Sequence, residues 1–166
     1  MGVDNNQIIT EVFNAFLHNS SLVGISEFSS GHINDTYFIQ TEEQTDFVLQ
    51  RINSDVFKNV PELVSNKVKI SKHLASKVPH LTEQELRRAV LTFVPTLAGN
   101  YYHLDAQGNF WNLTYYIADS QSYDTVTHKE IAYEGGKLFG KFINDTSDFD
   151  AQQLVEIIPG FHDVPK

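Results

Sequence analysis

The segments Ser30-Gly31-His32-Ile33-Asn34-Asp35-Thr36-Tyr37 and Phe47-Val48-Leu49-Gln50-Arg51-Ile52-Asn53 are the most informative parts of this sequence. They predict a glycine-containing turn between two strands, followed by a third strand that carries Arg51 near its end. Arg51 is the first Lys or Arg of the chain, and seven acidic residues precede it. A first cation at the end of an acidic stretch indicates a defined electrostatic role for this side chain.

The flanking sequence predicts helices and strands on both sides of these segments. In chain order they are a helix capped by Asp4 and reaching Leu17, strands over 25–28, 36–41 and 47–53, a helix over 61–76, strands over 90–94, 101–104 and 110–117, and helices over 128–144 and 149–158. The first three strands are expected to form an antiparallel meander. The three glycines of the 128–144 helix predict a close backbone neighbour there.

This order predicts an α+β fold. It is the layout of a protein-kinase-like small lobe, with an antiparallel sheet of about five strands and the 61–76 helix packed on one face. We assign residues 1–117 to this lobe and residues 118–166 to a hinge and the first helices of a large lobe.

Composition limits the possible functions. The 166 residues carry a net charge of −9 and no cysteine, which argues against binding to nucleic acid or an anionic membrane and excludes disulfides and thiolate metal sites. The N-terminus has no basic segment followed by an apolar one, so we expect no signal peptide and a cytoplasmic location. Any phosphate binding must then depend on a local cation.

The turn and the third strand predict a phosphate site. Backbone N–H groups near Gly31 are candidates to cradle phosphate oxygens, with Asn34 and Thr36 as side-chain donors. Leu49 and Arg51 project to the same face of their strand, so Leu49 is a candidate contact for an adenine ring and Arg51 for the phosphates. The alternatives are an ordinary hairpin turn and an edge-strand arginine in a surface ion pair.

These segments resemble the small lobe of the aminoglycoside phosphotransferase and choline kinase superfamily, and within it the bacterial N-acetylhexosamine 1-kinases of carbohydrate metabolism. The resemblance runs from about Val23 to the end of the chain and rests on residues 31–37, 48–53, 56–58, 111–117, 122–124 and 157–163. It implies ATP and Mg²⁺ as cofactors and Arg51 as the phosphate-contacting cation. It also implies an adenine-binding hinge at Tyr116, Ile117 and Ala118.

The sequence departs from this pattern on the 61–76 helix, where kinases of this shape carry a carboxylate that pairs with the strand cation. Its middle has Ser65 and Asn66, and Glu62 is its only acid. Glu62 is a candidate partner for Arg51, but its place in the first turn is equally explained by the helix dipole. We expect Lys67, Lys69 and Lys72 to form a solvated face of the same helix.

A second departure concerns catalysis. Residues 103–109 imitate the H-x-D-x-x-x-x-N motif, but Asp105 and Asn109 are four residues apart instead of five, and we interpret the segment as a hairpin turn. No catalytic residue or metal ligand is therefore assigned in this chain, and the family's catalytic loop is expected beyond Lys166. The sequence leaves open whether the chain is a fragment or a truncated product.

These observations predict the ATP-binding part of a small-molecule kinase that phosphorylates an N-acetylhexosamine at the 1-position. The alternatives are a choline- or homoserine-type kinase and a non-catalytic nucleotide-binding or interaction module. The expected partners are a nucleotide and a small-molecule substrate, together with a second copy of the chain bound through the surface that faces the large lobe.

Overall fold

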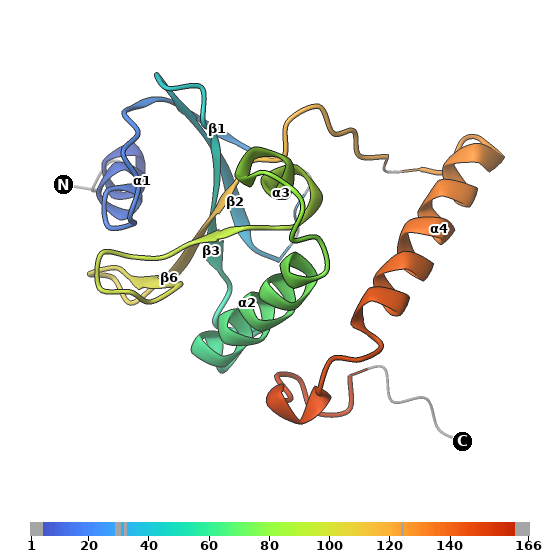
Figure 1. The fold of residues 1–166 in the computed structure, drawn as a ribbon. Helices are drawn as coiled ribbons and strands as arrows, with labels where there is room; N and C mark the ends of the chain where they lie inside the picture. The colour runs from blue at the N-terminus through green and yellow to red at the C-terminus, as the bar shows by residue number, and fades with distance from the viewer. Residues whose placement is uncertain (1–4, 29–30, 32, 124, 162–166) are drawn as a thin grey trace.

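The computed structural model describes residues 5–28, 31, 33–123 and 125–161. In these residues the fold is α+β, an open antiparallel sheet of six strands with four helices (Figure 1). The sheet stands in the middle of the molecule, with α1 on one side and α2 and α4 on the other (Figure 1). None of the helices in the described part of the chain combines the length and the apolar character needed to cross a bilayer.

The sheet has the order β1-β2-β3-β6-β4, and the short β5 also pairs with β6. Its strands are β1 (Leu22–Glu27), β2 (Asp35–Thr41), β3 (Phe47–Ile52), β4 (Phe93–Val94), β5 (His103–Leu104) and β6 (Phe110–Tyr115). The predicted meander of the first three strands is confirmed, and every pairing in the sheet is antiparallel. Because β6 enters between β3 and β4, the middle of the sheet joins segments about 60 residues apart in the chain, for example Arg51 and Trp111.

Helix α1 (Asn5–Phe13) closes one face of the sheet. It ends earlier than predicted, because Phe16 leaves the helix to form a bridge with Thr96 at the edge of the sheet. Phe16 is still buried in the core, whereas Leu17 is 57% exposed. The predicted cap, Asp4, lies outside the described residues.

Helix α2 (Val60–Ser76) lies on the opposite face, as predicted. Asn59 caps its N-terminus by accepting a hydrogen bond from the backbone N–H of Glu62, and Pro61 occupies its first turn. Its apolar positions Val60, Val64 and Val68 recur every four residues, which places them on one side of the helix. They pack against a second core cluster that includes Ile52, Phe93 and Phe110.

Helix α3 (Glu83–Ala89) directly precedes the strand predicted over 90–94, and the sequence pattern did not predict it. Thr82 and Glu85 form a reciprocal capping box, which is a recognisable helix start in the sequence. Val90 serves as the C-cap, so the strand is reduced to β4.

Helix α4 (Lys129–Thr146) leaves most of its apolar side chains exposed, and none of its residues is buried. Leu138, Phe139 and Ile143 are 70%, 68% and 56% exposed. The close neighbour predicted at its glycines is absent from the described structure, since a Cβ built on Gly136 or Gly140 meets no atom within 4 Å.

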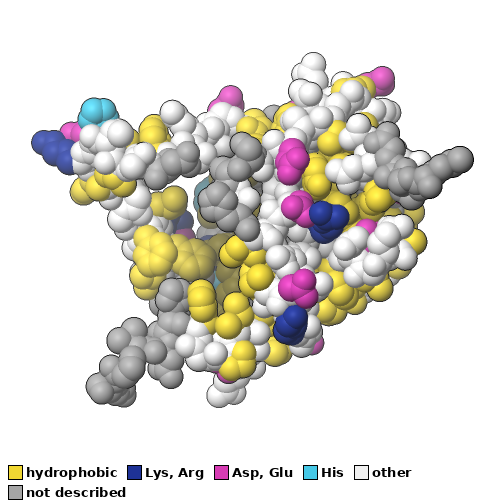
Figure 2. All heavy atoms as spheres, turned by 180° about the vertical axis from the view of Figure 1, so that it is seen from behind, with side chains coloured by type: hydrophobic (Ala, Val, Ile, Leu, Met, Phe, Trp, Pro, Cys, Tyr) yellow, Lys and Arg dark blue, Asp and Glu magenta, His cyan; other side chains and the backbone are white. Residues whose placement is uncertain are grey.

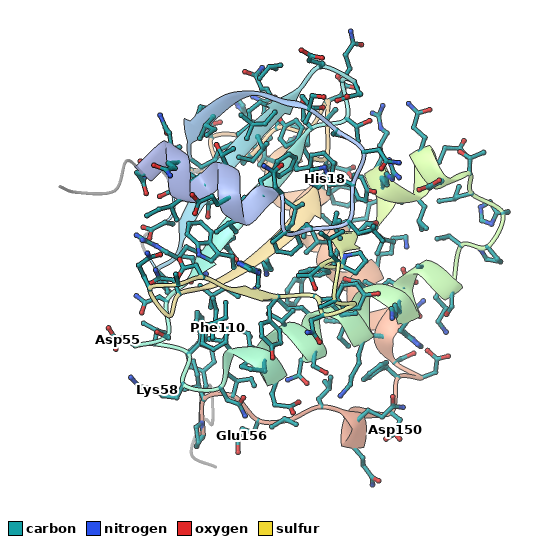
Figure 3. The ribbon with its side chains drawn as sticks, turned by 90° about the vertical axis from the view of Figure 1, so that its left-hand side faces the viewer. His18, Asp55, Lys58, Phe110, Asp150 and Glu156 are labelled. Carbon is teal, nitrogen blue, oxygen red and sulfur yellow. The ribbon has the colours of Figure 1, made fainter. Side chains whose placement is uncertain are left out.

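The helix predicted over 149–158 is wrong, because only the 3₁₀ turn Ala151–Gln153 forms there. Side chains on the outward side of α2 bind backbone groups of this segment that a helix would need for its own hydrogen bonds. Asn66 donates from Nδ2 to the Val155 carbonyl (2.7 Å) and accepts the Val155 N–H through Oδ1 (3.1 Å), and Lys69 donates to the Gln153 carbonyl. Asp150 and Glu156 mark the segment in Figure 3, where it runs along the side of α2 away from the sheet.

Candidate functional site

Strand alternation gives the sheet two faces with different chemistry. On the α1 face, the central side chains of β2, β3 and β6 are buried together in one apolar cluster. Leu49 and Trp111 belong to this face and are each 0% exposed. Leu49 therefore has no surface that an adenine ring could touch, although the prediction that it shares a face with Arg51 agrees with the strand register.

Arg51 lies at the end of the same α1 face and is engaged there. Its Nε and a terminal nitrogen donate to Asp35 Oδ2 at 2.6 and 2.5 Å, and its guanidinium carbon lies 5.7 Å from the centre of the Trp111 ring. Asp35 and Arg51 are directly opposite each other on β2 and β3. The candidate pair with Glu62 does not form, because α2 packs on the other face of the sheet.

Asp105 organises the hairpin between β5 and β6. One oxygen, Oδ1, accepts the backbone N–H groups of Gln107 and Asn109, and the other accepts the indole N–H of Trp111 at 2.8 Å. Burial acts to raise the pKa of Asp105, but these hydrogen bonds and those from the Asn109 side chain outweigh it and hold the pKa below its ordinary value. This agrees with the interpretation of residues 103–109 as a turn.

The α2 face carries a row of polar side chains across three adjacent strands. Thr36 on β2 lies opposite Gln50 on β3, and Gln50 lies opposite Asn112 on β6. Gln50 donates from Nε2 to Thr36 Oγ1 at 3.2 Å. We call Thr36, Gln50 and Asn112 the polar row.

Asn112 is the unusual member of the polar row. It is 2% exposed, and its side-chain Nδ2 is buried without a hydrogen-bond partner in the described structure. Such an orphan donor usually costs about 1–3 kcal/mol, so its presence in a native fold requires an explanation. A ligand atom that accepts from Nδ2 would provide one.

An apolar surface lies on the same face, next to the polar row along the strands. Phe38, Val48 and Tyr116 are only half-buried, and the Phe38 ring meets the Tyr116 ring edge-on at 4.7 Å. Phe28 extends the surface, since its ring lies 6.1 Å from that of Phe38. We call Phe28, Phe38, Val48 and Tyr116 the aromatic end.

The turn before β2 is joined to the end of β3 by hydrogen bonds. A Cβ added to Gly31 would lie 3.3 Å from the carbonyl oxygen of Asn34, so the chain turns tightly here. Asn34 Oδ1 accepts the Asn53 N–H and therefore ties the turn to the end of β3. Ser30 and His32, which belong to the same sequence segment, lie outside the described residues.

The predicted hinge residues Tyr116, Ile117 and Ala118 directly follow β6. Tyr116 is held in place by a backbone hydrogen bond from its N–H to the Asp46 carbonyl (2.9 Å). Tyr116 and Ile117 are half-buried and Ala118 is exposed. The strand register thus places Thr36 and Tyr116 on the α2 side of the sheet, and leaves Leu49 and Arg51 on the other.

Helix α2 packs on this face against Ile52 of β3, Phe93 of β4 and Phe110 of β6. A hollow remains between the sheet and α4, and Figure 2 shows it from behind with the apolar side chains of α4 at its rim. A separate apolar cavity lies where α4 meets α2 and α3, between Leu74, Val90 and Phe142. Its volume of about 120 Å³ is too small for a nucleotide, because drug-sized ligands occupy about 300–1,000 Å³.

No known protein-family model matches this chain. Within the described ranges, no three His, Asp or Glu side chains converge as a metal site. The site is therefore defined by its own geometry, which is a polar row and an aromatic end on one half-covered sheet face, with a tight turn before β2.

Sequence reasoning found the strands of this site but missed Gln50, Asn112 and Val48. The available signal was the alternation along β3 and β6, which separates positions 48, 50 and 112 from positions 49, 51 and 111. Choosing between the two sets requires knowing which face α1 covers, and that information comes from tertiary packing.

Proposed function

We propose that this chain is the ATP-binding small lobe and hinge of a small-molecule kinase of the aminoglycoside phosphotransferase and choline kinase superfamily. The proposed reaction of the intact enzyme is transfer of the γ-phosphoryl group of ATP to the 1-position of an N-acetylhexosamine. The observation that carries the proposal is the α2 face, because one open surface offers an apolar end and a polar end in the order that a nucleotide requires.

In this proposal the adenine ring lies against Phe38, Val48 and Tyr116, and the phosphates lie toward the polar row and the Gly31 turn. The strand contacts are then Val48 and Gln50, one residue before the Leu49 and Arg51 pair expected from the sequence. Support comes from exposure, since Val48 and Gln50 are half-buried on the open face while Leu49 is completely buried. An adenine ring suits an aromatic and aliphatic surface of this kind.

The described residues fit ATP better than they fit its metal. Mg²⁺ in such sites is bound by one or two carboxylates together with the phosphates, and the polar row contains amides and a hydroxyl but no carboxylate. The proposal therefore assigns ATP contacts to this chain and no Mg²⁺ ligand.

Titration calorimetry with ATP and with adenosine tests the proposal. We expect both ligands to bind weakly, and Val48→Trp to abolish both interactions by filling the aromatic end. Val23→Trp is the matched control, because Val23 lies on β1 and is 57% exposed. Failure of the unchanged chain to bind either ligand at millimolar concentration would contradict the proposal.

We expect no kinase turnover by this chain alone. The carboxylate oxygens of Asp105 are committed to five hydrogen bonds within the hairpin, so Asp105 is not available as a catalytic base. A coupled assay with ATP and N-acetylglucosamine or N-acetylgalactosamine checks this, and choline and homoserine test the alternative substrates. Turnover that Asp105→Asn abolishes would reverse the interpretation.

A second candidate function, an interaction module, is favoured by the exposed apolar side of α4. Phe139 and Ile143 together present a surface of the kind that mediates protein association. Light scattering should then detect a dimer of this chain that Phe139→Glu dissociates. A monomer at high concentration would remove the support for this candidate.

A further inference from the structure

Lys67 differs from the other lysines of α2. The sequence predicted one solvated face for Lys67, Lys69 and Lys72, but the structure separates them. Lys69 binds the Gln153 carbonyl, and Lys72 Nζ lies 5.0 Å from the centre of the Tyr101 ring. Lys67 is half-buried, and neither an ion pair nor a hydrogen bond joins it to another described residue.

The position of Lys67 around the helix points it to the open side. Taking Val64 as the centre of the buried side, Lys67 lies about 60° to one side and Lys72 about 80° to the other, at 100° per residue. Leu74 lies on the same flank as Lys67 and lines the cavity with α4, whereas Lys72 meets Tyr101 on the opposite flank. Lys67 therefore lies on the flank of α2 that carries Leu74 and faces away from Tyr101.

The chemistry of Lys67 is that of a cation without a counter-charge. Burial lowers the pKa of its ammonium group, and no described carboxylate offsets the effect. The Asn112 amide donor, on the sheet face against which α2 packs, is also without a partner in the described structure. Two independent donors with nothing to bind are best satisfied by one polyanionic ligand.

We propose that the Lys67 ammonium and the Asn112 side-chain amide bind the phosphate oxygens of the nucleotide, so that the phosphate-binding cation is supplied by α2 and not by β3. This inference rests on the proposed function, which supplies the nucleotide. It also gives the middle of α2 a role different from the carboxylate pairing expected there from the resemblance. Asp35 then retains Arg51 in a structural pair on the other face.

Calorimetry with ATP, adenosine and inorganic triphosphate separates this inference from the proposed function. Lys67→Met should weaken ATP and triphosphate binding about tenfold or more and leave adenosine binding unchanged. Lys72→Met is the matched control and should change none of the three. Asn112→Leu should weaken ATP several-fold without loss of stability.

Unchanged ATP affinity in Lys67→Met would overturn the inference while leaving the proposed function intact. Failure of the unchanged chain to bind either ATP or adenosine would overturn both the inference and the proposed function. A measurement on the unchanged chain avoids any folding defect of the variants. NMR titration of the lysine ammonium groups should show that ATP raises the pKa of the lysine that has the lowest pKa, and that adenosine does not. A pKa that ATP leaves unchanged would count against the inference.

Discussion

The two faces of the sheet satisfy their buried polar groups in different ways. On the α1 face, the indole N–H of Trp111 is completely buried and is matched by Asp105. On the α2 face, the neighbouring residue Asn112 is almost as deeply buried, yet its amide nitrogen has no partner in the described structure. Adjacent residues of one strand thus show a completed core on one side and an incomplete polar surface on the other.

This difference separates the part of the molecule that supplies stability from the part that is open to a ligand. Folding alone favours pairing every buried donor, because an orphan costs about 1–3 kcal/mol. Where that cost is retained beside a half-covered surface, the binding site proposed above would offset it. The α1 face should therefore be sensitive to substitution through stability, and the polar row and aromatic end of the α2 face mainly through nucleotide affinity.

The largest expected effect compares neighbouring residues on the two faces. Leu49→Ala should lower the free energy of unfolding by about 3–5 kcal/mol, because it leaves a cavity in a fully packed core. Val48→Ala should cost only about 1 kcal/mol, since Val48 is half-buried and α2 does not cover it. Urea denaturation measures both, and equal costs would mean that the two faces are packed alike.

The next effect tests the partner of Trp111. Asp105→Ala should cost about 2–3 kcal/mol, because the buried indole N–H and two backbone N–H groups lose their acceptor. Asp105→Asn should cost less, since its amide oxygen can still accept. Thermal unfolding of the two variants makes the comparison, and a small loss in Asp105→Ala would show that water replaces the carboxylate.

The same carboxylate predicts a pH dependence. The folded pKa of Asp105 is lowered from 3.8, so its stabilising contribution is complete above that value and is lost as the pH falls through the folded pKa. Stability measured from pH 5 to pH 2 should therefore fall less steeply in Asp105→Ala than in the unchanged chain. Parallel curves would assign the acid sensitivity to other groups.

The sequence predicted the elements that depend on local patterns. Apolar residues at helical spacing identified α1, with its end placed four residues too late, and all of α2 except its first residue. Alternation with turn residues identified β2, β3 and β6 within one or two residues. The helix over 149–158 failed for a tertiary reason, because side chains on α2, about 85 residues earlier in the chain, bind the backbone of that segment. Helix α3 was missed although Thr82 and Glu85 form a local capping signal.

The candidate site was harder to predict than the fold. The strand that carries the site was predicted correctly. Neighbouring residues of a strand point to opposite faces, and only the elements that cover each face distinguish the two. The sequence pattern assigned the phosphate contact to Arg51, which lies on the α1 face. The adjacent residue Gln50 lies on the open face. The sequence did not distinguish Lys67 from Lys69 and Lys72, because all three lie at helical spacing. Their burial and contacts in the structure separate them.

Asn112→Leu tests the cost of the incomplete polar surface. Removal of an orphan amide should leave stability unchanged or raise it by about 1 kcal/mol, in contrast to the loss expected at Asp105. Thr114→Val, the next position on the same face of β6, is the control for a change of polarity alone. Marked destabilisation by Asn112→Leu would indicate that the amide is satisfied within the fold.

The smallest effect is expected at the most conspicuous charge. Arg51 and Asp35 have side chains that are 37% and 43% exposed, so solvent screening limits their pair, and Arg51→Ala should cost no more than about 1 kcal/mol. It should also leave ATP affinity unchanged, because Arg51 lies on the α1 face, whereas Gln50→Ala on the open face should weaken ATP binding. Calorimetry on the two variants compares adjacent residues of one strand. If Arg51→Ala weakens ATP binding and Gln50→Ala does not, the nucleotide contacts the α1 side of the sheet, as the sequence indicated. The binding site would then be assigned to the α1 face and not to the α2 face.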